Sequence, residues 1–266
     1  MRVISYGGGV QSSALIVLAA TGKIDKVDAA IFSNVGDDSE HPETLSYVRE
    51  IMAPWALERG IQVHELHRTL KDGSTQTLWQ RMMDHEGDTL REPIPVFGYS
   101  GAPMSRSCTA DHKIKVLGKW IKANCPELPA SVLIGISTDE YQRANRGKNE
   151  KWETREYPLL DLGLSRNDCV QVIKNAGLPV PPKSSCFYCP FHNMQTWAEL
   201  KRDSPDLFDK AQQLEDKLNE RRKNRNKPPV YLTRKNNRLS LVVHEAGPTL
   251  FEPFNDGKCD EGACWT

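Results

Sequence analysis

A glycine-rich turn near the start of the sequence is the first segment whose residue types could do chemistry. It contains Gly7, Gly8, Gly9, Gln11, Ser12 and Ser13. Because the turn lies between a segment typical of a buried strand and one typical of a helix, its backbone N–H groups and the positive helix end can hold a phosphate. It has neither the lysine of a P-loop nor the glycine spacing of a dinucleotide-binding turn. A purely structural glycine turn is therefore the alternative.

Two cysteines in a CxxC spacing form a second candidate site. Cys186 and Cys189 enclose two aromatic residues and are followed by Pro190. This spacing places two thiolates on one tight turn, close enough to share a zinc ion or an iron–sulfur cluster. The alternative is a pair of buried cysteines that act as small hydrophobic side chains. A metal site would need further ligands from elsewhere in the chain.

Other cysteines and histidines favour a structural interpretation. Cys125 and Cys169 lie in segments with amphipathic helical patterns, so we expect them to pack in the core. His112 and His192 lie near candidate cysteines, but the histidines form no HxxxH spacing. We expect both to be structural residues.

A basic stretch between residues 217 and 227 is a candidate nucleic-acid contact. Its cations are Lys217, Arg221, Arg222, Lys223, Arg225 and Lys227, and its one carboxylate is Glu220. Such a stretch can follow a phosphate backbone. It is also typical of a solvated helix end, where cations interact favourably with the helix dipole.

The elements that must position these groups alternate between strand and helix. Apolar runs predict strands at residues 2–6, 29–33, 61–66 and 132–136. Helical patterns fall at residues 11–20, 42–59, 110–124 and 165–177, with Pro54 expected to kink or divide the second helix. Short connections between alternating strands and helices predict an α/β fold, a parallel sheet with helices on both faces.

Three proline-, glycine- or charge-rich segments divide this pattern. Residues 87–107 lack periodicity and predict a long functional loop. Residues 139–157 are polar and charged, which suggests a mobile flap. Prolines at 179, 181 and 182 then break the chain. We therefore predict an α/β domain at residues 1–180 and a helical, cysteine-containing extension at residues 181–266.

Composition limits the protein class. The 266 residues carry 35 Lys and Arg against 35 Asp and Glu, and 38% of them are hydrophobic, which excludes a collagenous, low-complexity or wholly disordered chain. The longest apolar run, residues 14–20, is too short for a membrane helix and does not resemble a secretory signal. We therefore expect a cytoplasmic protein without a membrane span, whose seven cysteines are thiols or ligands rather than a disulfide framework.

Several segments together resemble a known family, the PP-loop ATP pyrophosphatases, and within it the phosphoadenosine phosphosulfate (PAPS) reductase-like branch. Residues 7–12 resemble the family's SGGxDS loop, with Gly7 in place of its first Ser and Gln11 in place of Asp. The other matching segments are residues 32–36 with 42–44, residues 106–109 with 113–114, residues 135–140 with Arg143, and the CxxC with its cysteine-bearing tail. Ser137 replaces an arginine of the branch motif.

The resemblance implies a nucleotide site. It implies an adenine nucleotide alpha hydrolase-like fold, in which residues 7–13 bind the phosphates of ATP or an adenylyl-sulfate, with Mg²⁺, and Ser33 contacts the adenosine. Arg143, Lys113 and Arg106 become candidates for neutralising phosphate or sulfate, because cationic side chains donate to oxyanions. Arg143 follows a predicted strand, at the edge where open α/β sheets bind ligands.

The resemblance also implies a metal centre. Cys108 becomes the third ligand beside Cys186 and Cys189 in a [4Fe–4S] cluster, with zinc as the alternative metal. Ser107 stands where related reductases have a second cysteine. The fourth position is then an open iron or a tail cysteine, and Cys259 or Cys264 could instead be a catalytic nucleophile.

Three functions follow from these expectations. The first is ATP-dependent adenylation of an acceptor, such as a tRNA or DNA base, followed by sulfur transfer from a thiol or other sulfur donor. The second is reduction of a sulfonucleotide by a cysteine thiolate. The third is a metal-containing nucleic-acid-binding module without catalysis. Ser137 and the basic stretch favour the first.

Overall fold

The computed structural model describes residues 1–84, 92–144 and 149–243 of the chain. These residues form two compact units. Among the described residues, the first unit contains those of 1–75 and 110–185, and the second contains those of 76–109 and 186–243. Residues 76–109 thus group with the C-terminal part of the chain, whereas the sequence pattern suggested a division near residue 180.

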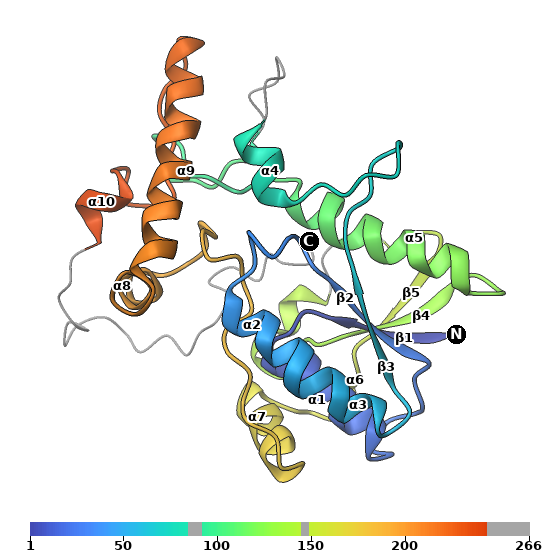
Figure 1. Ribbon diagram of the computed structural model, residues 1–266. Coiled ribbons are helices and arrows are strands. Elements are labelled where there is room, and N and C mark those ends of the chain that lie inside the picture. The colour runs from blue at the N-terminus through green and yellow to red at the C-terminus, as the bar shows by residue number, and fades with distance from the viewer. Residues whose placement is uncertain (85–91, 145–148, 244–266) are drawn as a thin grey trace. The chain divides into compact units, whose positions relative to one another are not determined.

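A five-stranded parallel sheet is the centre of the first unit (Figure 1). The strands are β1 (Arg2–Tyr6), β2 (Ala29–Ser33), β3 (Gln62–Leu66), β4 (Ala130–Ile134) and β5 (Glu153–Glu156). Their order is β3-β2-β1-β4-β5, and every neighbouring pair is parallel. This confirms the predicted α/β class.

Side chains of alternating direction form one core on each face of the sheet. Ile4 of β1 belongs to the core that contains α1 (Val10–Ala20) and α7 (Arg166–Asn175), whereas its neighbour Val3 belongs to the core that contains α5 (Lys115–Asn124). The period of two along a strand sends successive side chains to opposite faces. Figure 1 shows α1 and α5 on opposite sides of the sheet. Helices therefore cover both faces, as predicted, and Cys169 and Cys125 lie in the two cores.

The helix predicted over residues 42–59 changes its hydrogen-bonding pattern before its proline. It consists of α2 (Pro42–Ser46), a π-helical segment (Tyr47–Met52) and α3 (Ala53–Leu57). Pro54 has no amide hydrogen, so α-helical hydrogen bonding cannot continue through it. Gly60 then has a φ of 78°, which ends the helix before β3.

The segment predicted as a polar flap contains regular structure. A 3-10 helix spans Thr138–Arg143 and β5 adds an edge strand at Glu153–Glu156, while residues 145–148 lie outside the described residues. The Glu153 side chain is buried and lies 2.7 Å from an Nη2 of Arg155. The flap prediction is wrong for β5, because an ion pair rather than an apolar run allows this charged strand to join the sheet. The short helix α6 (Pro158–Asp161) follows.

The second unit is helical. Its helices are α4 (Leu78–Met83), α8 (Met194–Asp203), α9 (Pro205–Asn224) and α10 (Leu239–Val242). Aromatic rings pack in its interior, where Trp79 contacts both Phe187 and Tyr188 and Trp197 contacts Phe208. In the described ranges of both units, none of the helices has the length and apolarity required to cross a bilayer.

Candidate functional site

The centre of the sheet brings two loops together. The chain runs from β1 outward through β2 and β3, then returns to the other side of β1 as β4. Ligands of open α/β sheets bind beyond the carboxyl ends of the strands, at the point where the strand order reverses. The glycine turn after β1 and the loop that starts at Gly135 after β4 are the two segments at this point.

Two glycines allow the backbone to pass closely there. A Cβ atom at Gly135 would lie 2.8 Å from the backbone nitrogen of Ser12, so the loop after β4 directly contacts the first turn of α1. Gly8 has a φ of +75°, and a Cβ there would lie 2.8 Å from Cγ2 of Thr44. Neither position accepts a side chain without movement of its neighbours.

Serine hydroxyls hold the glycine turn in shape. The Ser12 hydroxyl donates to the Gly9 carbonyl at 3.2 Å and accepts from the Gly7 amide at 3.2 Å. The Ser184 hydroxyl donates to the Gly7 carbonyl, and the buried Ser13 hydroxyl donates to Tyr6 Oη at 3.4 Å. Gly9 is the N-cap of α1 and offers no capping side chain. The first-turn amides of α1 are therefore the donors that this turn offers to an anion.

Gln11 lies between a guanidinium and a carboxylate. Arg166 Nη1 donates to Gln11 Oε1 at 2.9 Å, and Gln11 Nε2 donates to Glu140 Oε2 at 3.4 Å. The same Glu140 oxygen accepts from Arg143 Nη1 at 2.6 Å, and both side chains of that ion pair are about nine-tenths buried. Arg143 is thus connected to the turn through Glu140, and its charge is already balanced by that carboxylate.

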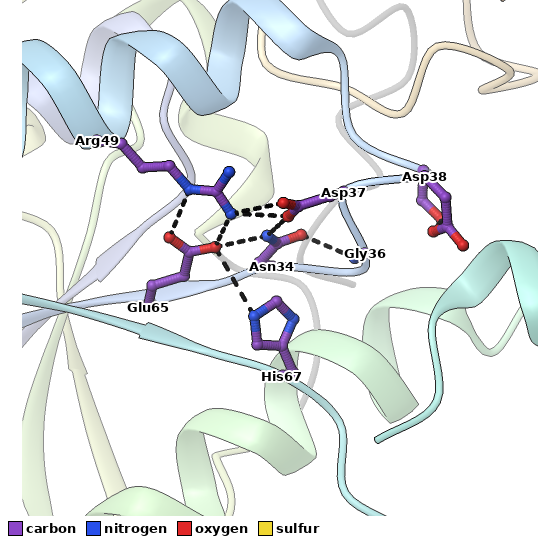
Figure 2. Close-up of polar contacts among 8 residues, drawn as sticks. Asn34, Gly36, Asp37, Asp38, Arg49, Glu65 and His67 are labelled. Atoms are coloured by element: carbon purple, nitrogen blue, oxygen red, sulfur yellow. Dashed lines mark hydrogen bonds and ion pairs between the residues drawn. The ribbon is translucent and has the colours of Figure 1, made fainter. Parts of the chain in front are cut away.

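A network of charged and amide groups lies at the ends of β2 and β3 (Figure 2). Asn34 Nδ2 donates to Asp37 and to Glu65, each at 2.7 Å, and Asn34 Oδ1 accepts from the Gly36 amide at 2.7 Å. Arg49 Nη2 donates to the same two carboxylates at 2.7 and 2.6 Å. Asp38, in contrast, points away from this network in Figure 2.

Arg49 determines the ionisation of this network. Its hydrogen bonds hold the pKa of both Asp37 and Glu65 below their ordinary values, with a smaller contribution from Asn34. His67 Nε2 lies 3.7 Å from Glu65. Sequence reasoning included Asn34 in a family motif but missed Arg49 and Glu65, because they come from different elements and share no local spacing.

Ser33 and Lys113, both predicted to contact the nucleotide, lie together in the structure. The Ser33 hydroxyl donates to the backbone carbonyl of Lys113 at 3.5 Å. The contact therefore uses the main chain of Lys113, within a π-helical segment at Ala110–Ile114 that leads into α5.

No family model, curated protein or solved structure matched this chain. The resemblance described above therefore rests on sequence motifs, and the site is interpreted from its own geometry.

The cysteines of the predicted metal centre belong to the second unit. Cys186, Cys189 and Cys108 are all in it, and the Cys189 amide donates to the Cys186 carbonyl at 3.1 Å, as expected for a tight turn. Within the described ranges, no three His, Cys, Asp or Glu side chains are grouped so as to hold a metal ion. Cys259 and Cys264 lie outside those ranges. The cluster stays a prediction.

Other cations differ in their surroundings. Arg106, in the second unit, stacks 5.5 Å from the ring centre of Phe191. In α9, Arg222 is buried and donates to the Pro228 carbonyl at 2.6 Å. Arg221 lies 3.7 Å from Glu92, and burial lowers its pKa. The basic stretch is therefore not a uniformly solvated surface, because these two arginines are internal parts of the unit.

Proposed function

We propose that this protein binds an adenine nucleotide, ATP or an adenylyl-sulfate, at the glycine turn after β1. The observation that carries the proposal is the close approach of Gly135 to the first turn of α1 at the centre of the sheet. It supports a binding site because the amides of α1 and the loop after β4 then border the same space. The positive end of the helix would favour the negatively charged phosphates.

The reaction that we propose is adenylation of an acceptor oxygen followed by sulfur transfer. The acceptor oxygen forms a bond to the α-phosphorus of ATP while the bond to pyrophosphate breaks, and a sulfur nucleophile then displaces AMP. The amides of the turn would stabilise the charge that develops on the α-phosphate. Ser137 is fully buried and donates to Asp139 at 3.3 Å, so it supplies no charge to a sulfate group, which favours adenylation over sulfonucleotide reduction.

The family resemblance also implies two bound groups, Mg²⁺ and an iron–sulfur cluster. Mg²⁺ prefers carboxylate oxygens. The nearby Glu140 and Asp139 carboxylates already accept hydrogen bonds from Arg143 and from the Arg166 amide. For the iron–sulfur cluster, the thiols of Cys108, Cys186 and Cys189 have suitable chemistry, but the described residues contain no assembled ligand group.

A matched pair of variants at Gly9 tests the proposal. Gly9 has extended backbone angles, and an added Cβ would meet Ser184 at an ordinary 3.5 Å, so both Asp and Asn fit there. Both residues cap helices equally well, but only Asp places a negative charge at the phosphate position. We expect Gly9→Asp to bind ATP at least about tenfold more weakly than Gly9→Asn in calorimetric titration. Equal affinities would contradict the site.

Activity requires a second measurement. With wild-type protein, pyrophosphate release from ATP should depend on the acceptor, so RNA, DNA and small acceptors are tested separately. Release of sulfite from an adenylyl-sulfate in the presence of a thiol would favour the reductase alternative instead.

A further inference from the structure

A pocket lies in the first unit, between α5 and the end of β3 with the segment that follows it. Its volume is about 490 Å³, within the usual range for small-molecule sites. The lining comes from residues 66–71 and from residues between 111 and 124. None of these residues belongs to the glycine turn, so the pocket and the proposed nucleotide site are formed by different residues.

Positive charge dominates the pocket lining. The cationic side chains are Arg68, Lys71, Lys115 and Lys119, and the one carboxylate among the lining residues is Asp111. Asp111 accepts from Lys115 Nζ at 2.6 Å, so that pair is internally balanced. Lys71 and Lys119 would attract an anion, because a concave surface of one sign concentrates its field.

An aromatic wall faces the same space. Trp120 of α5 lines the pocket, and its ring lies 5.1 Å from the ring of His64 in β3. Leu66, Leu70 and Val116 add apolar surface. Lys119 Nζ donates to the Thr69 hydroxyl at 2.6 Å, which ties α5 to the segment after β3. The wall is therefore held by contacts from two elements.

We propose that this pocket binds a small organic anion in which a planar ring carries a phosphate group. The ring would pack against Trp120 and the apolar side chains, and the phosphate would accept hydrogen bonds from Lys119 and Lys71. A phosphate suits this lining better than a carboxylate, because it offers three oxygens and up to two negative charges to several separated cations.

Phenyl phosphate is the probe that tests the pocket, in calorimetric titration of the full chain. We expect saturable binding that is at least about tenfold tighter than the binding of methyl phosphate, which has no ring, or of benzoate, which has no phosphate. Lys119→Gln and Lys71→Gln should each weaken it by about three- to tenfold. Lys122→Gln is the matched control, because Lys122 is exposed on α5 but outside the lining.

The outcomes separate this site from the glycine turn. Loss of phenyl phosphate binding in Gly9→Asp, with unchanged binding in Lys119→Gln, would place the probe at the turn and overturn the proposal. Equal effects of Lys119→Gln and Lys122→Gln would also overturn it, as would equal affinities for benzoate and phenyl phosphate. In Trp120→Leu we expect the preference for phenyl over methyl phosphate to disappear. The lysine variants test the proposal even if this variant folds poorly.

Discussion

Arg49 and Glu65 form a two-point ion pair that joins the π-helical segment after α2 to β3. Arg49 Nε donates to Glu65 Oε2 at 2.9 Å, and Nη2 donates to Oε1 at 2.6 Å. Because Arg49 Nη2 also reaches Asp37, one guanidinium holds the loop after β2 against the end of β3. The planar guanidinium presents two parallel N–H groups to the two oxygens of one carboxylate. A lysine ammonium cannot form the same parallel pair of bonds.

Removal of Arg49 should loosen this loop. We expect Arg49→Gln to lower the free energy of unfolding by about 1 kcal/mol, since the partners are partly exposed and their attraction is screened. Urea unfolding measures the change. Arg202→Gln is the control, because its 2.7 Å pair with Asp203 is largely exposed and should contribute less. An equal or larger loss in Arg202→Gln would contradict the role given to Arg49.

The same network predicts a dependence on acid. The pKa values of Asp37 and Glu65 lie below their ordinary values of 3.8 and 4.5, chiefly because Arg49 hydrogen-bonds to the charged carboxylates. A pKa that is lower in the folded state stabilises the fold above the unfolded pKa, and this stabilisation is lost as pH falls through the folded pKa. The stability difference between wild type and Arg49→Gln should therefore shrink as the pH falls from about 5 to about 2. A constant difference over that range would refute this explanation.

Gly135 should tolerate substitution worse than Gly7. A Cβ at Gly135 would lie 2.8 Å from a backbone atom of Ser12, whereas the nearest atom to a Cβ at Gly7 is 4.0 Å away. We expect Gly135→Ala to destabilise by about 1–3 kcal/mol, because the backbone must shift, and Gly7→Ala to have a much smaller effect. Thermal unfolding of the two variants compares them directly. Similar melting temperatures for Gly135→Ala and Gly7→Ala would contradict the close contact between the loop after β4 and α1.

The cysteine prediction is tested by metal analysis of protein isolated without oxygen. We expect iron and acid-labile sulfide, both lost in Cys108→Ser, Cys186→Ser and Cys189→Ser. Cys125→Ala and Cys169→Ala are the controls and should retain them. Alanine is the better replacement at Cys169, because that thiol is fully buried, its burial raises its pKa to about 12, and a serine hydroxyl there would need a partner. If the protein contains zinc but no iron or sulfide, the cysteines hold a zinc ion and the cluster prediction is wrong.

Tail cysteines can be distinguished by the same analysis. Retained iron with lost activity in Cys264→Ser or Cys259→Ser would indicate a nucleophile. Lost iron would indicate the fourth ligand.

Nucleic-acid binding, if it uses α9, should depend on its exposed cations. Lys223 near the end of α9 and Lys227 just after that helix are exposed, whereas Arg222 is buried and bonded to the Pro228 carbonyl. Neutralising Lys223 and Lys227 should reduce the salt dependence of RNA or DNA affinity by about one unit of slope each. Arg222→Gln should instead destabilise the unit by about 1–3 kcal/mol, because it replaces a buried side chain and removes its hydrogen bond to the Pro228 carbonyl. An unchanged slope in the lysine variants would exclude this end of α9 as the contact.

Local patterns in the sequence were sufficient for the central strands and several helix ends. The apolar runs of β1 and β2 are buried on both faces, so their composition alone marks them as inner strands, and their bounds are those predicted. Ser165 and Asp168 form a capping box at the start of α7, next to the predicted helix start at residue 165, because both hydrogen bonds are made within four residues. The glycine turn was also evident, since its strand, turn and helix are contiguous.

Tertiary structure alone decided which distant charges meet. Arg49, Asp37 and Glu65 come from three segments, and only the order of β2 and β3 in the sheet brings them together. Arg155 makes the charged strand β5 compatible with burial, and the pocket beside Trp120 exists only because α5 packs near β3. These features depend on contacts between residues far apart in the chain, whose energies no local pattern of residue types encodes.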